Sequence, residues 1–143
     1  FINAMNVKAI QLGMQKSQFR DPTGLDKRNI STAKDLLKLV RAAYQYSLIR
    51  DLTTTASENI KIGKKRNSIG FNNTNPLVRK GAWDIGLSKT GFIRESGRCL
   101  VLQTVIDGEP IIIVLLNSYG KLTRFADVKR IKSWMNRVNK KKT

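Results

Sequence analysis

The sequence predicts an α+β fold in which helices flank an antiparallel sheet, and three observations support this prediction. The chain has 143 residues, of which 41% are hydrophobic and 7% aromatic, as is typical of globular domains. Apolar, strand-like runs follow one another closely between residues 83 and 117. Helical spacing of apolar residues occurs on both sides of that region, and a sheet with two apolar faces needs helices to cover it.

Residues 2–13 are predicted to form the first helix. Their apolar residues recur at helical spacing, and Gly13 follows as a C-cap. Residues 20–24 contain Asp, Pro, Thr and Gly, which indicate a turn.

A second helix is predicted to begin at Ser31 or Thr32 as N-cap and to end near Tyr46. Asp35 in its first turn suits the positive end of the helix dipole. The helix has one broad apolar face, made of Leu36, Leu37, Leu39, Val40, Ala43 and Tyr44. Residues 52–75 are polar, and short edge strands are predicted at 59–62 and 68–72.

Three strands are predicted in the second half of the chain. Residues 83–88 alternate between apolar and polar or small, as a half-buried strand does. Residues 98–107 and 110–117 are apolar on both faces, and a tight turn at 107–109 joins them. We therefore expect these two strands to form an antiparallel hairpin at the centre of the sheet.

The last predicted element is an amphipathic helix, which we expect to pack on one face of the sheet. Its apolar face is formed by Phe125, Val128, Ile131, Trp134, Met135 and Val138.

Composition excludes several kinds of chemistry. The chain has no His, so it holds no Ser-His-Asp triad, no His-Cys dyad and no His-rich metal site. Cys99 is the single cysteine, which excludes an internal disulfide and a thiolate-rich metal site. We expect no cofactor and no metal. Cys99 lies on an apolar strand and is expected to be a small core residue rather than a nucleophile.

The longest apolar run, 111–116, is far shorter than the ~20 residues of a membrane span.

The formal charge of +17 is concentrated in two stretches, residues 59–80 and 123–143. Such charge indicates an anionic partner, and nucleic acid is one candidate. However, aromatic residues are not interleaved with the basic runs, and no nucleic-acid-binding motif is present. A solvated basic surface suited to an anionic cell wall or membrane face is the favoured interpretation.

Lys89, Thr90 and Gly91 form a Lys-Thr-Gly sequence at the predicted end of the first strand, after Ser88 and before Phe92. Three residues alone are also compatible with a simple strand end followed by a turn. The strand context, however, is the one that enzymes forming penicilloyl-serine adducts require of this motif.

Further blocks along the chain resemble the serine D-alanyl-D-alanine peptidases. The closest resemblance is to low-molecular-mass penicillin-binding proteins of the DD-endopeptidase type, number seven in the common naming. The blocks are residues 3–6 (Asn-Ala-Met-Asn), 8–9, 12–14, 19–25 (Phe-Arg-Asp-Pro-Thr-Gly-Leu), 31–33, 35–36, 73–75 (Asn-Thr-Asn), 77–78, 83–85 leading into 88–91, and 97–101.

This resemblance implies a β-lactamase/transpeptidase-like fold and a periplasmic enzyme. Such an enzyme cleaves D-alanyl bonds of peptidoglycan peptides through an acyl-serine intermediate and binds β-lactams. It implies that Lys89 supplies positive charge to the serine machinery and that Thr90, with Ser88, binds the substrate carboxylate. Gly91 and the Phe92 backbone are implied to line the acyl site and its oxyanion hole. Arg94 and Arg98, close after the motif, are left out of the site.

The same resemblance implies that the whole chain, 1–143, is the C-terminal half of a peptidase domain. The family carries a Ser-x-x-Lys motif, whose Ser is the nucleophile, and a Ser-x-Asn motif, and both stand upstream of the matched region. An N-terminal half of the same protein is therefore the expected partner, and this chain alone is expected to be inactive. Whether the activity is that of an endopeptidase or a carboxypeptidase is left open.

Two apparent motifs inside the chain are interpreted as coincidences. Ser31 to Lys34 reads as Ser-x-x-Lys, and Ser57 to Asn59 reads as Ser-x-Asn. Ser31 is already explained as an N-cap, and both segments match non-catalytic parts of the family pattern. The alternative to a peptidase is a basic module that binds nucleic acid or an anionic wall polymer, with an incidental Lys-Thr-Gly.

Overall fold

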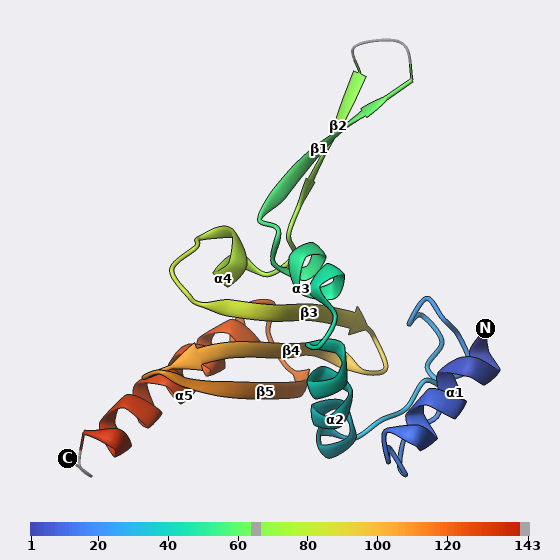
Figure 1. Ribbon diagram of the computed structural model, residues 1–143, viewed down its shortest axis with the longest axis horizontal. Coiled ribbons are helices and arrows are strands. Elements are labelled where there is room, and N and C mark those ends of the chain that lie inside the picture. Colours follow the sequence, from blue (N-terminus) through green and yellow to red (C-terminus); the bar gives the residue numbers. More distant parts are fainter. Residues whose placement is uncertain (64–66, 141–143) are drawn as a thin grey trace.

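The computed structural model describes residues 1–63 and 67–140, and its centre is a three-stranded antiparallel sheet (Figure 1). The sheet contains β3 (Ile85–Ile93), β4 (Gly97–Ile106) and β5 (Glu109–Ser118) in the order β3-β4-β5. The predicted α+β class and antiparallel hairpin are confirmed. In the described part of the chain β4 is the central strand, and β5 lies at an edge of the sheet rather than at its centre.

The β4–β5 connection is a two-residue turn. Asp107 and Gly108 have φ values of 53° and 81°, so both central residues adopt the left-handed conformation. A turn of this kind matches the right-handed twist of the two strands, which explains why Asp-Gly is favoured there.

A one-residue bulge at Gly86 changes which side chains of β3 share a face. Ile85 is opposite Thr104, but Leu87 is opposite Gln103, so one residue of β3 has no partner on β4. Because opposite residues share a face, Ile85 and Leu87 lie on different faces of the sheet. The simple alternation predicted for residues 83–88 is therefore interrupted at the bulge.

Helix α5 (Thr123–Asn139) packs on one face of the sheet, as predicted. The core on this face contains Leu77, Leu100, Leu102, Ile113, Phe125 and Val128, all buried. The apolar face of the helix extends beyond this core, because Trp134 is 57% exposed.

Helix α2 (Ala33–Ala43) packs against β4 and β5. Its N-cap is Thr32, whose Oγ1 accepts a hydrogen bond from the Asp35 N–H at 3.2 Å. Of the two predicted N-caps Thr32 is confirmed, whereas Ser31 is not an N-cap, because its hydroxyl bonds to the Ser17 hydroxyl at 2.7 Å.

Helix α1 (Ile2–Gln11) lies at one end of the molecule, close to residues 12–32, which connect it to α2 and are called the N-terminal loop (Figure 1). Asn6 joins the two, because its Nδ2 donates to the Phe19 carbonyl and its Oδ1 accepts from the Phe19 N–H. Leu12 is the C-cap, and Gly13 follows with a φ of 70°, a conformation that favours glycine.

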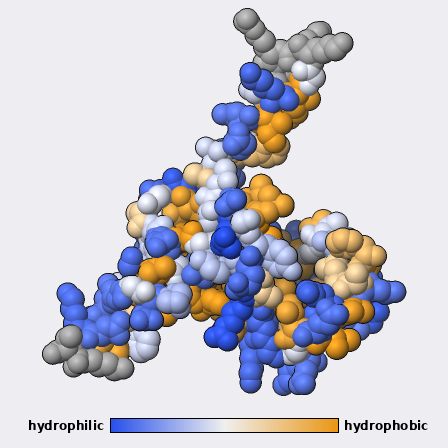
Figure 2. Space-filling model, in the orientation of Figure 1, coloured by the Kyte–Doolittle hydropathy of each residue, from blue (hydrophilic) through white to orange (hydrophobic). Residues whose placement is uncertain are grey.

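Four short elements separate α2 from the sheet. Helix α3 (Ser47–Thr54) was not predicted. Strands β1 (Ser57–Ile62) and β2 (Asn67–Asn72) lie where short strands were expected, but they pair with each other in a separate two-stranded sheet and are not edges of the β3-β4-β5 sheet. The β1–β2 hairpin projects from the body of the molecule (Figure 1) and carries exposed apolar side chains (Figure 2). Helix α4 (Pro76–Arg79) then leads toward β3.

Among the described residues, no helix has the length and apolar character required to cross a bilayer.

Candidate active site

The Lys-Thr-Gly motif lies inside β3 rather than at the end of a strand. The strand continues to Ile93, two residues beyond the last residue of the motif. Lys89 and Gly91 are opposite Val101 and Cys99, whereas Thr90 is opposite Leu100, which belongs to the core under α5. The bulge at Gly86 thus places Lys89 on the face opposite α5 and Thr90 on the same face as α5.

Lys89 is an exposed cation on this strand. Its Nζ donates a hydrogen bond to the Thr90 carbonyl oxygen at 2.7 Å, and no described carboxylate forms a salt bridge with it. An ammonium group held in this way keeps two further N–H donors for a neighbouring hydroxyl or for a substrate.

Ser88 is buried and faces a different partner from the one predicted. Its hydroxyl accepts a hydrogen bond from Asn75 Nδ2 at 2.9 Å, and the exposed fractions of Ser88 and Asn75 are 5% and 0%. Asn75 is also the N-cap of α4, because its Oδ1 accepts from the Leu77 N–H at 2.9 Å. The Ser88 side chain therefore joins β3 to the 73–75 loop and is not open to a substrate.

Thr90 meets a second hydroxyl from the same loop. The Oγ1 atoms of Thr74 and Thr90 are 2.6 Å apart, within hydrogen-bond distance. Thr74 is exposed and Thr90 is half-buried, so solvent or a ligand can reach this pair. The resemblance included residues 73–75 but gave them no role, and nothing in their spacing indicated a contact with residue 90.

The outer edge of β3 is covered at one end by α3. The Ser88 N–H donates to Thr53 Oγ1 at 3.4 Å, so it points away from β4. Backbone N–H groups alternate in direction along a strand, which places the N–H groups of Thr90 and Phe92 on the same outer edge. An extended peptide can pair with such an edge by adding a strand to it.

Gly91 and Phe92 lie on the part of β3 that is more exposed. A Cβ added to Gly91 would have its nearest contact 3.8 Å away, at Cys99 Cβ, so the fold does not require glycine there. Phe92 is 55% exposed, and the Arg98 guanidinium carbon lies 4.3 Å from the centre of its ring. This cation–π contact holds Arg98, which was not predicted to belong to the site, beside the end of the motif.

Arg124, in the first turn of α5, was counted in the sequence only as part of the basic C-terminal stretch. It is 7% exposed, and its Nε and Nη1 have no hydrogen-bond partner. Burial lowers the pKa of its guanidinium, and the nearby positive charge of Arg98 lowers it further. The structure thus places two arginine charges close together near the end of β3.

The two coincidental motifs are not part of this site. Ser57 and Asn59 lie on the projecting β1 strand, and Ser31 bonds to Ser17 and to the Thr32 carbonyl. In the described ranges neither serine hydroxyl bonds to a lysine. The interpretation of both segments as non-catalytic agrees with this placement.

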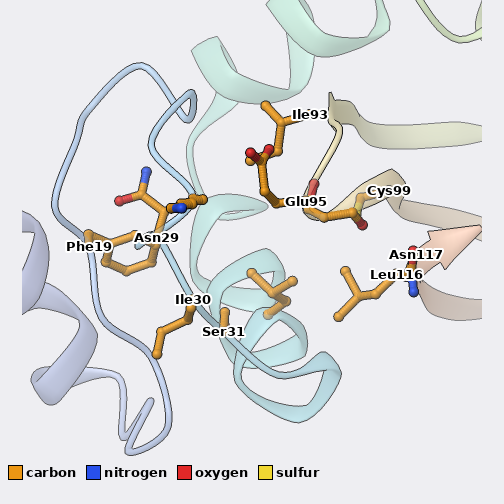
Figure 3. Close-up of a pocket in the computed structure, with 12 residues that line it drawn as sticks. Phe19, Asn29, Ile30, Ser31, Ile93, Glu95, Cys99, Leu116 and Asn117 are labelled. Carbon is orange, nitrogen blue, oxygen red and sulfur yellow. The ribbon is translucent and has the colours of Figure 1, made fainter.

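A pocket of about 450 Å³ lies between the N-terminal loop and the β3–β4 turn (Figure 3). Phe19, Ser31, Glu95 and Cys99 are among its lining residues, and the Lys-Thr-Gly motif is not. Cys99 is half-buried, with its Sγ 3.5 Å from the Ser96 carbonyl oxygen, so it lines a pocket instead of filling the core as predicted. Within residues 1–63 and 67–140, no three His, Cys, Asp or Glu side chains gather as metal ligands would.

The sequence is similar to known proteins over most of its length. Residues 1–120 match the D-alanyl-D-alanine carboxypeptidase family, peptidase S11. The chain is 45% identical to a D-alanyl-D-alanine endopeptidase of Escherichia coli and 42% identical to one of Pseudomonas aeruginosa, each over 135 residues. Each alignment covers 94% of this chain and 44% of the relative, so the chain spans less than half the length of these relatives.

Solved structures of the same class share the fold. The Streptomyces K15 DD-transpeptidase superposes with a TM-score of 0.81 at 27% identity, over 93% of this chain and 52% of the other. Penicillin-binding protein D2 of Listeria monocytogenes, solved with cefotaxime bound, gives a TM-score of 0.77 at 26% identity, over 92% of this chain and 53% of the other. These matches favour the peptidase interpretation over the basic binding module.

Proposed function

This chain belongs to the D-alanyl-D-alanine carboxypeptidase family, and we propose that the protein carrying it is a serine-type DD-peptidase acting on peptidoglycan peptides. The observation that carries the proposal is the exposed Lys89 on an accessible strand edge, with Thr90 and Gly91 beside it. A cation, a hydroxyl and an open backbone edge are the groups needed to bind an anionic peptide beside a nucleophile.

In the proposed reaction a serine hydroxyl attacks the carbonyl carbon of a D-alanyl peptide bond. The C–O bond of an acyl-serine forms, the C–N bond breaks, and the serine proton is passed to the leaving amine. Water then attacks the acyl carbon and releases the serine and a carboxylic acid. β-Lactams would acylate the same serine, and a bound β-lactam in the Listeria structure supports this expectation.

Lys89 would act through its positive charge. An ammonium near the serine lowers the free energy of the oxyanion and assists proton transfer between the serine and the leaving amine. The Phe92 N–H, on the outer edge of β3, would donate to the carbonyl oxygen as it becomes negative. Gly91 would leave room for the substrate backbone along this edge.

Thr90 would bind the substrate carboxylate through its hydroxyl. The pair of positive charges at Arg98 and Arg124 favours an anion near this end of the strand. The burial of Ser88 against Asn75 supports a structural role for that hydroxyl, so we do not propose that Ser88 touches the substrate.

We propose that the activity is that of an endopeptidase. The relatives at 45% and 42% identity are named D-alanyl-D-alanine endopeptidases, whereas a carboxypeptidase of Bacillus subtilis is 26% identical. We further propose that the protein works in the periplasm, where peptidoglycan lies. The charge of +17 would favour association with the anionic cell envelope.

We also propose that the nucleophile lies outside this chain, on a preceding segment of the same protein. The relatives are more than twice as long as the matched region, and neither candidate serine lies beside Lys89. Phe1–Thr143 would then be the C-terminal half of the peptidase domain.

The test is labelling with a fluorescent penicillin, followed by denaturing electrophoresis. The full-length protein should become covalently labelled, and the isolated 143-residue chain should not. Absence of label on the folded full-length protein would overturn the peptidase proposal. Covalent label on the isolated chain would show that the nucleophile lies within it and would overturn the proposal of a preceding half.

A further inference from the structure

Thr74 lies outside β3, and its side chain forms a hydrogen bond with a side chain of the Lys-Thr-Gly motif. Its Oγ1 lies 2.6 Å from Thr90 Oγ1. Among the described residues, no other side chain forms a hydrogen bond with the side chain of Lys89 or Thr90.

The position of Thr74 is determined by its two neighbours. On one side Asn75 is fully buried, caps α4 and donates to the Ser88 hydroxyl. On the other side Asn73 Nδ2 donates to the carbonyl oxygens of Thr53 and Thr55, at 3.0 and 2.9 Å. Two anchored asparagines therefore hold the Thr74 backbone against β3, and its exposed side chain needs no other partner to stay there.

A hydroxyl has one proton to donate and two lone pairs that accept. In the pair formed by Thr74 and Thr90, one hydroxyl must donate and the other accept. If Thr90 is to bind a carboxylate, its own proton must go to that anion, because a carboxylate only accepts. Thr74 must then be the donor to Thr90. A hydroxyl that accepts one hydrogen bond also becomes a better donor in the next.

We infer that Thr74 is a positioning residue, which donates its hydroxyl proton to Thr90 and so directs the Thr90 proton toward the carboxylate of the substrate. This inference rests on the proposed function, since Thr90 is the group assigned to the carboxylate. It adds a residue from a separate loop to substrate recognition. It also implies that loss of the Thr74 hydroxyl lowers kcat/KM only for substrates that carry this carboxylate.

The experiment compares Thr74→Val and Thr74→Ser in the full-length protein. Valine keeps the shape of threonine and removes the hydroxyl, whereas serine keeps the hydroxyl. Each variant is assayed on a D-alanyl peptide whose leaving group carries a free α-carboxylate, and on the same peptide with a carboxamide there. Thr23→Val, in an exposed turn where Thr23 bonds to Asp21, is the matched control.

We expect Thr74→Val to lower kcat/KM for the carboxylate peptide about tenfold and to change the carboxamide rate less than about twofold. Thr74→Ser and Thr23→Val should remain within about threefold of the wild type on both peptides. Equal rates for Thr74→Val and wild type on the carboxylate peptide would overturn the inference. An equal loss on both peptides, or a failure of Thr74→Ser to restore the rate, would also overturn it.

Failure of this inference is distinguishable from failure of the proposed function. If the wild-type protein is labelled by penicillin and cleaves both peptides, the function stands whatever Thr74→Val does. If the wild-type protein does neither, the function itself is wrong. Thermal unfolding of Thr74→Val, expected at the wild-type temperature because the side chain is exposed, separates a loss of recognition from a loss of folding.

Discussion

Asn75 Nδ2 donates a hydrogen bond to the Ser88 hydroxyl across 2.9 Å, between two buried side chains. The same asparagine caps α4 through the Leu77 N–H. One side chain thus fixes the 73–75 loop, the start of α4 and the strand that carries Lys89. Because the loop also presents Thr74 to Thr90, the stability of this bond is coupled to the geometry of the site.

Substitution of Asn75 by Ala should destabilise the protein by about 2–4 kcal/mol, because it removes a helix cap and leaves Ser88 and the Leu77 N–H without partners. The free energy of unfolding, measured with urea on the full-length protein, gives the size of the loss. Asn72→Ala, at an exposed position of β2, should cost less than about 0.5 kcal/mol. Similar losses in both variants would contradict the role of the Asn75–Ser88 bond.

Substitution of Lys89 by Ala should lower the rate of acylation by fluorescent penicillin by about 10²–10⁴, because the positive charge beside the serine is lost. Lys129→Ala removes the same charge from an exposed position of α5 and should leave the rate unchanged. A Lys89→Ala variant that is acylated as fast as Lys129→Ala would refute the proposed role of this ammonium.

Substitution of Gly91 by Ala should leave the melting temperature within about 2 °C of the wild type and lower the acylation rate at least about tenfold. The fold has room for the added methyl group, because its nearest contact would be 3.8 Å away. A peptide that lies along β3 as proposed would collide with this methyl group. Differential scanning fluorimetry and the penicillin assay measure the two effects separately. An unchanged acylation rate would argue against substrate binding along this edge.

Substitution of Gly86 by Ala, unlike that of Gly91, should destabilise the fold, by about 1–3 kcal/mol. A Cβ at this position would lie 2.2 Å from Gln103 Oε1 and 2.5 Å from Tyr44 Cε2, so the side chains of Gln103 and Tyr44 must shift. Urea unfolding measures the loss. A Gly86→Ala protein as stable as the wild type would show that the bulge tolerates a side chain.

The stability of the protein should fall in acid partly through Asp35. Burial raises the pKa of this carboxyl, but hydrogen bonds from the Lys16 N–H and the Ser17 hydroxyl and the charge of Lys38 outweigh it, so the pKa lies below its ordinary value of 3.8. The unfolded state then binds a proton more readily than the folded state. The stabilisation is therefore complete above the ordinary pKa and is lost as the pH falls through the folded pKa.

Asp35→Asn should accordingly show a smaller drop in melting temperature between about pH 5 and pH 3 than the wild type. Ser17→Ala, which removes one of the hydrogen-bond donors to Asp35, should give an intermediate drop. Equal drops in the wild type and Asp35→Asn would mean that this carboxyl does not contribute to the acid sensitivity.

Local patterns were enough to predict most of the secondary structure. Apolar periodicity predicted α1, α2 and α5, and the Asp-Gly turn predicted the β4–β5 hairpin, because these signals lie within one element or between neighbours. Helix α3 was not predicted, because its eight residues are too few for an apolar periodicity to be recognised and its end is rich in Thr. The family and the motif were predicted from the resemblance of ordered blocks, not from periodicity.

By itself, the sequence determined the fold class, the exclusion of His-based chemistry and the identity of the motif on a strand. Only the tertiary structure decided which face of the sheet Lys89 occupies, because one unpaired residue at Gly86 reverses the alternation of side chains along β3. It also brought Thr74 to Thr90 and Asn75 to Ser88, across separations of 16 and 13 residues. Contacts between polar side chains at such separations leave no periodic signal, since they depend on how a loop packs against a strand.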